Sequence, residues 1–270
     1  MVLQALRSLI FWIFLFSVTA ILSLIVAIFT LVPPWSGAVS RFCASAWTWS
    51  MKLNLRLTVG IRHEISGREN IPATGAIVAS KHQSDYDIIA LYPLFNYPSF
   101  IAKKQLFQIP VFGTALRVLK TIEIDRSSGS AGMKGMIADA KKRIAEGNFI
   151  FIFPEGTRKA PLAEPDYRFG VAKMYEDLDV PVVPIALNTG LYWGRNSFIL
   201  WPGTAKITIL PPIPPGLSGT EMMKQLRDRV DGETTRLVLD AVDRGLTRPI
   251  DSTFRERIDA ARKPAATDAA

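Results

Sequence analysis

The chain has 270 residues, of which 49% are hydrophobic, and its formal net charge is +8. This length allows one sizeable catalytic domain and a smaller appendage. The charge alone would fit nucleic acid, but no dense stripe of Lys and Arg is interleaved with aromatic residues, so we expect no nucleic-acid binding. Because Cys43 is the only cysteine, an intramolecular disulfide and a cysteine-based metal site are excluded.

The N-terminal region is apolar and basic. No charged residue lies between Ser8 and Val32, and at about 1.5 Å per residue a helix of that length would cross a hydrocarbon layer of about 30 Å. A signal peptide has a shorter apolar core, so we expect no cleavage. After Pro33-Pro34 comes a second apolar stretch, Ala38 to Met51. Two readings stay open, a monotopic hairpin that dips into one leaflet, which we favour, and one span followed by an interfacial helix.

Between about residue 59 and residue 217, short apolar runs alternate with helical patterns. Apolar residues recur at helical spacing from Met133 to Ile144, and Gly147 stands where a helix C-cap belongs. This alternation predicts an α/β fold with a largely parallel or mixed sheet covered by helices. The predicted strands are Ile77–Ala79, Ser99–Ala102, Thr121–Ile124, Phe149–Phe153, Val182–Leu187 and Ala205–Leu210.

We expect three parts along the chain. Residues 1–58 would be membrane-anchoring helices, residues 59–247 the catalytic domain, and residues 248–270 a polar, loose C-terminal tail without a core signal. Ser218 and Glu221 form a possible capping box for the last amphipathic helix of the catalytic domain.

His82 follows the predicted strand that ends near Ser80, and ligand sites of α/β folds favour the carboxyl ends of strands. A histidine there can serve as a general base if a carboxylate orients its ring. Asp85 and Asp87 are both candidates, because Asp85 is near in sequence, whereas Asp87 requires the chain to turn before a helix begins. The alternative is a solvated loop histidine. The other histidine, His63, is expected at the surface.

Two arginines end predicted strands. Phe153 to Arg158 leaves the most apolar strand and turns at once, and the guanidinium fork of Arg158 matches a phosphate. Gly156 permits close approach of the backbone. Arg126 ends another strand, so Arg126 and Arg158 would converge beside His82 if the strands are parallel neighbours. The alternative is a solvent-facing arginine at each strand end.

Other motifs are less specific. Lys103 and Lys104 add positive charge after a further strand, or are merely solvated, and we assign Val180 to Ile185 to core packing. No Walker loop, Gly-rich dinucleotide fingerprint or HExxH motif is present, so nucleotide or zinc chemistry is poorly supported and we expect no metal.

Taken in order, these blocks resemble the glycerolipid acyltransferases typified by 1-acylglycerol-3-phosphate acyltransferase (lysophosphatidate acyltransferase). The family's His-x4-Asp block matches His82 to Asp87, and its short strand ending in Arg matches Thr121 to Arg126. Its Phe-Pro-Glu-Gly-Thr-Arg block is identical to Phe153–Arg158, and its Val-Pro-Val-Val-Pro-type block matches Val180–Ile185. The resemblance covers roughly residues 60 to 190 and implies an acyltransferase domain.

The resemblance implies a mechanism. His82, oriented by Asp87, would take the proton from the sn-2 hydroxyl of lysophosphatidic acid, and the alkoxide would attack the thioester of acyl-CoA or acyl carrier protein. No cofactor other than this acyl donor is implied. Backbone groups near Gly156 would stabilise the oxyanion. The residues expected to bind the acceptor are Arg126, Glu155, Gly156, Thr157, Arg158, Lys103 and Lys104.

Two departures from the family pattern leave the acceptor headgroup open. Lys81 stands where the family often has Asn, and Lys159 stands where Ser is common. Acylation of another lyso-lipid, such as lyso-ornithine lipid or a lysophospholipid, is therefore an alternative, and a non-catalytic membrane lipid-binding protein is the alternative from a different class. We expect the protein at the inner (plasma) membrane, with its catalytic domain on the cytoplasmic face.

Overall fold

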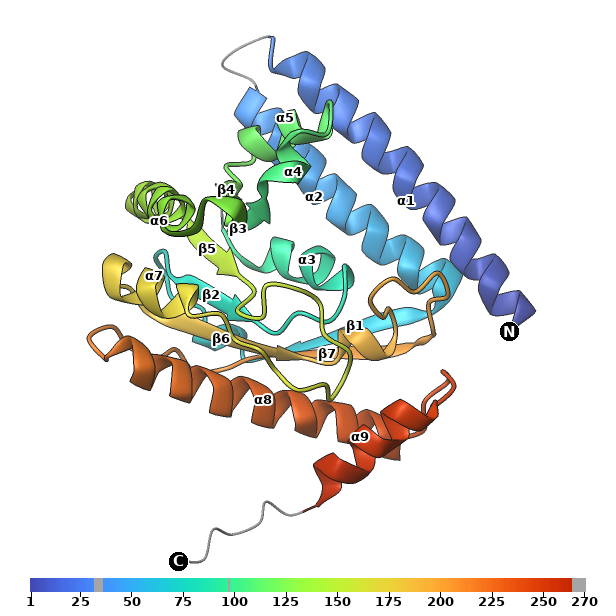
Figure 1. The fold of residues 1–270 in the computed structure, drawn as a ribbon. Helices are drawn as coiled ribbons and strands as arrows, with labels where there is room; N and C mark the ends of the chain where they lie inside the picture. Colours follow the sequence, from blue (N-terminus) through green and yellow to red (C-terminus); the bar gives the residue numbers. More distant parts are fainter. Residues whose placement is uncertain (32–35, 97, 264–270) are drawn as a thin grey trace, which may run out of the picture.

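The computed structural model describes residues 1–31, 36–96 and 98–263. The predicted break at Pro33-Pro34 lies outside these residues. The described part forms one seven-stranded sheet with helices on both sides (Figure 1). The helices are α1 Val2–Phe29, α2 Ser36–Asn54, α3 Tyr86–Leu91, α4 Lys104–Phe107, α5 Phe112–Val118, α6 Gly129–Ala145, α7 Gly170–Leu178, α8 Gly219–Asp243 and α9 Ser252–Arg262.

The sheet is mixed, as the alternation of strands and helices predicted. Its order is β1-β7-β6-β2-β5-β3-β4, and all neighbouring strands are parallel except β6 and β7, which are antiparallel. The carboxyl ends of β2, β5, β3 and β4 therefore meet at one edge of the sheet. The strands are β1 Ile61–Ser66, β2 Ile77–Ser80, β3 Pro98–Lys103, β4 Ile122–Ile124, β5 Phe149–Ile152, β6 Val182–Leu187 and β7 Gly203–Ile209.

Alternate residues of the central strands pack against different helices. Ile77 and Ala79 of β2 belong to a core cluster with apolar residues of α6, α7 and α8. Val78, between them, belongs to the second cluster, which includes residues of α1, α2 and α3. Both sides of the sheet are therefore covered, which is why the central strands read as continuous apolar runs. Ser218 caps α8 by accepting from the Glu221 N–H, as the capping box predicted.

The sequence did not predict β1. Its residues alternate between buried or half-buried and exposed positions, because β1 is an edge strand that pairs only with β7 among the described strands. Arg62 and Glu64 face solvent while Ile61 is buried. An alternating pattern of this kind is typical of a half-buried strand and was the available signal.

The N-terminal region contains the two expected helices, which run side by side over the α/β part of the molecule (Figure 1). The Trp47 indole of α2 donates to the Thr19 hydroxyl of α1 at 2.8 Å. The first half of α1 is docked on the loop after β6, since the Gln4 amide donates to the Leu200 carbonyl at 2.5 Å and the Leu200 N–H donates to the Ser8 hydroxyl at 2.9 Å. This half of α1 therefore lies along the domain.

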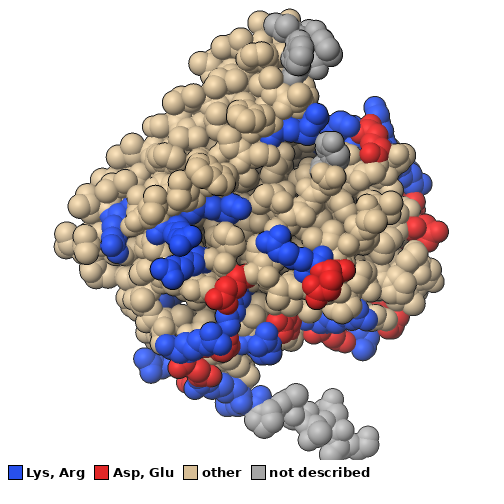
Figure 2. Space-filling view, turned by 180° about the vertical axis from the view of Figure 1, so that it is seen from behind, with Lys and Arg blue, Asp and Glu red and all other residues tan. Residues whose placement is uncertain are grey.

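Among the described residues, α1 is the one helix long and apolar enough to cross a membrane. Large apolar side chains stay exposed along it, including Leu6, Ile13 and Phe16, and Phe42 and Trp49 are exposed on α2. In Figure 2 the upper part of the molecule, where α1 and α2 lie, shows few charged side chains, whereas Lys, Arg, Asp and Glu gather below it. An exposed apolar area of this kind fits membrane association.

The prediction of a loose tail after about residue 248 was wrong for the described part. Residues 252–262 form α9, and its Phe254 and Ile258 are buried in the core cluster that contains Val238 of α8. The Asp251 side chain caps α9 by accepting from the Phe254 N–H. Only two large apolar side chains of this three-turn helix are buried. Its many charged residues leave a weak amphipathic pattern, so the sequence did not predict the helix.

Candidate active site

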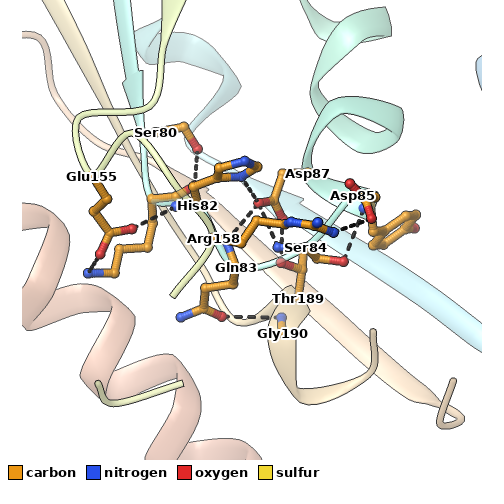
Figure 3. A network of polar contacts seen from close by, with 12 residues as sticks. Ser80, His82, Gln83, Ser84, Asp85, Asp87, Glu155, Arg158, Thr189 and Gly190 are labelled. Carbon is orange, nitrogen blue, oxygen red and sulfur yellow. Dashed lines mark hydrogen bonds and ion pairs between the residues drawn. The ribbon is translucent and has the colours of Figure 1, made fainter. Parts of the chain in front are cut away.

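His82 lies at the carboxyl end of β2, and its Nδ1 is 2.9 Å from Asp87 Oδ2. The chain turns after β2, and α3 begins at Tyr86, so Asp87 occupies the first turn of the helix and faces back toward His82 (Figure 3). This is the turn that a contact between these two residues requires. The structure thereby decides between the two predicted partners, since Asp85 pairs elsewhere. With Nδ1 bound to Asp87, the ring keeps Nε2 for proton transfer.

Asp87 is completely buried and accepts several hydrogen bonds. Its Oδ2 accepts the backbone N–H groups of Gln83 at 2.8 Å and Ser84 at 3.0 Å in addition to His82, and its Oδ1 accepts the hydroxyl of Thr189. Four donors of this kind fix the position of the carboxylate. The carboxylate in turn holds the imidazole in one tautomer and orientation.

The imidazole is also fixed by packing. The ring of Phe153, at the end of β5, stacks on His82 with ring centroids 3.8 Å apart. The side chain of His82 is 16% exposed, so it remains reachable from outside. Neither Phe153 nor Thr189 was predicted as a site residue from the sequence. Thr189 lies about a hundred positions from Asp87 along the chain, and no local pattern signals such a contact.

Arg158 is near His82 but is paired in this structure. Its Nη1 contacts Asp85 Oδ2, while Asp85 is half exposed and Arg158 is 23% exposed. Burial raises the pKa of Asp85 above its usual value, although the positive charge of Arg158 opposes this shift. The guanidinium of Arg158 is thus held beside His82 by the carboxylate of Asp85, which is itself half exposed to solvent.

Arg126 and Gly156 meet at the predicted strand ends. The Arg126 Nη1 donates to the Gly156 carbonyl at 3.0 Å. Gly156 has φ of +64°, and a Cβ built there would lie 3.4 Å from the guanidinium, so glycine suits both the turn and the close approach. The Gly156 N–H donates to the Phe153 carbonyl at 2.9 Å. The predicted backbone donors for the oxyanion therefore do not include the Gly156 N–H, because this group is already hydrogen-bonded within the turn.

Two residues predicted to bind substrate do not line the cavity. Glu155 is 1% exposed and its Oε1 is 2.7 Å from the Lys81 ammonium, because its side chain points below the turn rather than into the cavity. The Lys104 ammonium is 2.9 Å from Asp125, at the start of α4. The hydrogen bonds from Ser127, followed by the one from Lys104, hold the pKa of Asp125 well below its usual range. Lys103 is exposed and lines the cavity.

A cavity of about 1110 Å³ extends from these residues to the N-terminal helices. Its polar end is lined by His82, Lys103, Arg126, Thr157 and Arg158, together with Arg195, which the sequence did not single out. Its apolar end is lined by residues of α1, α2 and α5, among them Leu22, Val26, Cys43, Ala44, Phe112 and Ala115. A cavity with one cationic end and one apolar end matches an amphipathic ligand with an anionic head. Val180–Ile185, assigned to the core, does not line it.

His63 was expected at the surface but is half buried. Its Nδ1 is 2.9 Å from the Tyr86 hydroxyl, so it connects β1 to α3. Burial, followed by the charges of Lys52 and Arg68, lowers the pKa of His63. His63 does not line the cavity and is a structural contact.

His82, whose Nδ1 contacts a buried carboxylate, lies at the strand ends of an α/β sheet beside a cavity lined by arginines, an arrangement that suits general base chemistry on an anionic substrate. A family model described as Acyltransferase matches residues 62–188. The chain is 32% identical over 191 residues to the 1-acyl-sn-glycerol-3-phosphate acyltransferase of Pseudomonas aeruginosa, which covers 71% of this chain and 74% of that protein. The chain therefore belongs to the acyltransferase family.

One further relative and one solved structure are similar to this chain. The human 1-acyl-sn-glycerol-3-phosphate acyltransferase alpha is 26% identical over 183 residues, covering 67% of this chain and 65% of that protein. The crystal structure of PlsC from Thermotoga maritima, a 1-acyl-sn-glycerophosphate (LPA) acyltransferase, superposes with a TM-score of 0.70 at 20% identity. It covers 87% of this chain and 98% of that chain, so the two share the fold.

Proposed function

We propose that this protein transfers a fatty acyl group from a thioester to the sn-2 hydroxyl of 1-acylglycerol-3-phosphate and so makes phosphatidic acid. The observation that carries the proposal is the His82–Asp87 pair at the cationic end of a cavity whose other end is apolar. The activity named for the Pseudomonas and human relatives supports the same assignment.

In the proposed reaction His82 acts as the general base. Its Nε2 takes the proton of the acceptor hydroxyl while the hydroxyl oxygen attacks the thioester carbonyl carbon. The tetrahedral intermediate then collapses, the carbon–sulfur bond breaks, and the imidazolium returns the proton to the departing thiolate. Asp87 stabilises the transient imidazolium, and no covalent acyl-enzyme forms.

Arg126 and Arg158 would bind the acceptor phosphate, with Lys103 close by on the cavity wall. Arg158 contacts Asp85 in the structure, so a bound phosphate would compete with that carboxylate for the guanidinium. The acyl chains would occupy the apolar end of the cavity, between α1, α2 and α5. Lipids would enter the site from this end. We propose the inner membrane, with the catalytic domain on its cytoplasmic face, and acyl-CoA or acyl carrier protein as donor.

Asp85 also favours a second candidate acceptor. Its carboxylate is half exposed and lines the cavity beside Arg158, so a lyso-lipid that carries an ammonium group, such as lyso-ornithine lipid, would find a counter-charge there.

A panel on one detergent-solubilised sample decides between the candidates. Lysophosphatidic acid, lysophosphatidylglycerol and lyso-ornithine lipid are offered with oleoyl-CoA and with oleoyl-acyl carrier protein, and kcat/KM is compared. We expect the highest kcat/KM for lysophosphatidic acid. A higher value for lyso-ornithine lipid would favour the second candidate, and binding of lyso-lipids without turnover of any would overturn both.

A further inference from the structure

An ammonium group is buried directly beneath the active-site turn. Lys81, the residue before His82, is 5% exposed, and its Nζ is 2.7 Å from Glu155 Oε1 and 2.8 Å from Asp231 Oδ1. Lys81 directly follows β2, Glu155 lies in the turn after β5, and Asp231 lies in the middle of α8. Buried charges persist in proteins only when they are paired in this way, so the three side chains depend on one another.

The carboxylate of Glu155 connects Lys81 to the backbone of His82. Its Oε2 accepts the backbone N–H of His82 at 3.2 Å (Figure 3). Its Oε1 faces the Lys81 ammonium at 2.7 Å. The carbonyl of His82 accepts the Lys159 N–H at 2.9 Å, from the same loop. Both backbone groups of His82 are thus held by the segment that follows β5. The direction in which the imidazole leaves the backbone depends on these two contacts.

The opposite end of the arrangement is fixed as well. The Tyr167 hydroxyl donates to Asp231 Oδ1 at 3.0 Å, and the ring of Tyr167 lies 5.6 Å from the Lys81 Nζ. Arg227 of α8 lies over the same ring at 5.3 Å. Lys81, Glu155, Asp231 and Tyr167 do not line the cavity. They can influence the reaction only through the residues that do.

From these contacts we infer that Lys81 is a positioning residue, whose ammonium holds the Glu155 carboxylate in the place where it anchors the backbone of His82. The inference rests on the proposed function, because His82 is the proposed base. Without Lys81, the buried Glu155 carboxylate would lack its cation and would turn or be neutralised. His82 would then lose one backbone anchor, and its imidazole would shift relative to the acceptor hydroxyl while the cavity wall stays in place.

The chain offers a matched control. Lys206 of β7 contacts Asp240 of α8 at 2.7 Å and so also ties the sheet to α8, but neither side chain lines the cavity. If Lys81 served only to attach α8, then neither K81M nor K206M would lower kcat, although K81M, whose ammonium is more buried and meets two carboxylates, would lower the thermal midpoint more. If Lys81 positions the base, the two variants will differ in kcat and not only in thermal stability.

The test measures kcat and the KM values of acceptor and donor for wild type, K81M, K81R and K206M, together with thermal midpoints. We expect K81M to lower kcat about 10- to 100-fold, as displacement of a reacting group by about 1 Å does. Both KM values should stay within about twofold, because the cavity wall is unchanged. K81R, which keeps the charge, should recover part of kcat, and K206M should keep the wild-type kcat even where its midpoint falls.

A double-mutant cycle tests whether Lys81 acts through Glu155. We expect K81M to change kcat by less than about threefold when it is made in an E155A background, since the anchor is already lost. Losses that multiply would overturn the inference, as would a K81M enzyme with the wild-type kcat. If K81M does not fold, E155A removes the anchor itself and should lower kcat about 10-fold or more, and an unchanged kcat in E155A would contradict us. Wild-type inactivity toward lysophosphatidic acid would instead contradict the proposed function.

Discussion

Replacing Asp87 by Asn isolates the charge of the carboxylate from its geometry. Oδ2 of Asp87 receives two backbone N–H groups, from Gln83 and Ser84, as well as His82. An amide NH₂ cannot occupy that position, because it would face those donors. The amide oxygen of Asn must therefore take the place of Oδ2, and its NH₂ group must face Thr189, whose hydroxyl can accept as well as donate. The imidazole keeps its partner and its tautomer.

The expected loss follows from this orientation. A hydrogen bond to a charged group contributes about 1.5–3 kcal/mol and one between neutral groups about 0.5–1.5 kcal/mol. The difference, about 1–1.5 kcal/mol, corresponds to about a 5- to 13-fold fall in kcat for D87N. By contrast, D87A removes the acceptor altogether, so the tautomer is no longer fixed and the two buried N–H groups lose their partner. We expect D87A to lower kcat about 10²–10⁴-fold and the free energy of unfolding by about 2 kcal/mol or more.

The assay is release of thiol from oleoyl-CoA with lysophosphatidic acid as acceptor, measured at saturation for wild type, D87N and D87A. Thermal midpoints of the same samples show whether each variant is folded. A loss in D87N as large as that in D87A would refute the argument that the backbone donors keep the amide oxygen toward His82. A fully active D87N would show that the charge of Asp87 does not assist the reaction.

Three further predictions concern other parts of the molecule. Asp85→Asn should leave kcat near the wild-type value. It should lower the acceptor KM by up to about fivefold, because the acceptor phosphate no longer competes with a part-exposed ion pair that contributes up to about 1 kcal/mol. A kcat loss as large as that of D87A would instead make Asp85 the partner of the base. Phe254→Ala should lower the free energy of unfolding by about 3 kcal/mol, since Phe254 is 3% exposed, and unchanged chemical denaturation would mean that α9 is not part of the core. The pKa of His63 is lowered by burial and by Lys52, so His63 binds a proton more readily in the unfolded chain, and the free energy of unfolding should fall as the pH drops below about 6.5. The thermal midpoints at pH 5.5 and pH 7.5 should therefore lie closer together in His63→Gln than in wild type. The same difference in both proteins would contradict this reasoning.

The central strands and the base could be predicted from the sequence because their signals are local. Val182–Leu187 and Phe149–Ile152 are continuous apolar runs, as strands covered on both faces are. His82 and Asp87 are five residues apart, so one turn between strand and helix brings them together. The strand-end position of Arg126 and Arg158 follows from the parallel pairing of β3 with β4 and β5.

The contacts that could not be predicted join distant parts of the chain. Glu155 was assigned to the substrate, but its partner Lys81 is 74 positions away, and only the pairing of β2 with β5 brings them together. Arg158 pairs with Asp85 for the same reason. The edge strand β1 and the helix α9 escaped because each buries few side chains, so that neither has a strong apolar pattern.

The most direct measurement of the central claim is the conversion of lysophosphatidic acid to phosphatidic acid by purified wild-type protein and by His82→Ala, with product identified by mass spectrometry. Wild type should form phosphatidic acid from a thioester donor, and His82→Ala should do so about 10²–10⁴-fold more slowly while it still unfolds cooperatively as a folded protein. Phosphatidic acid formation by His82→Ala at the wild-type rate would contradict the assignment of this histidine as the base.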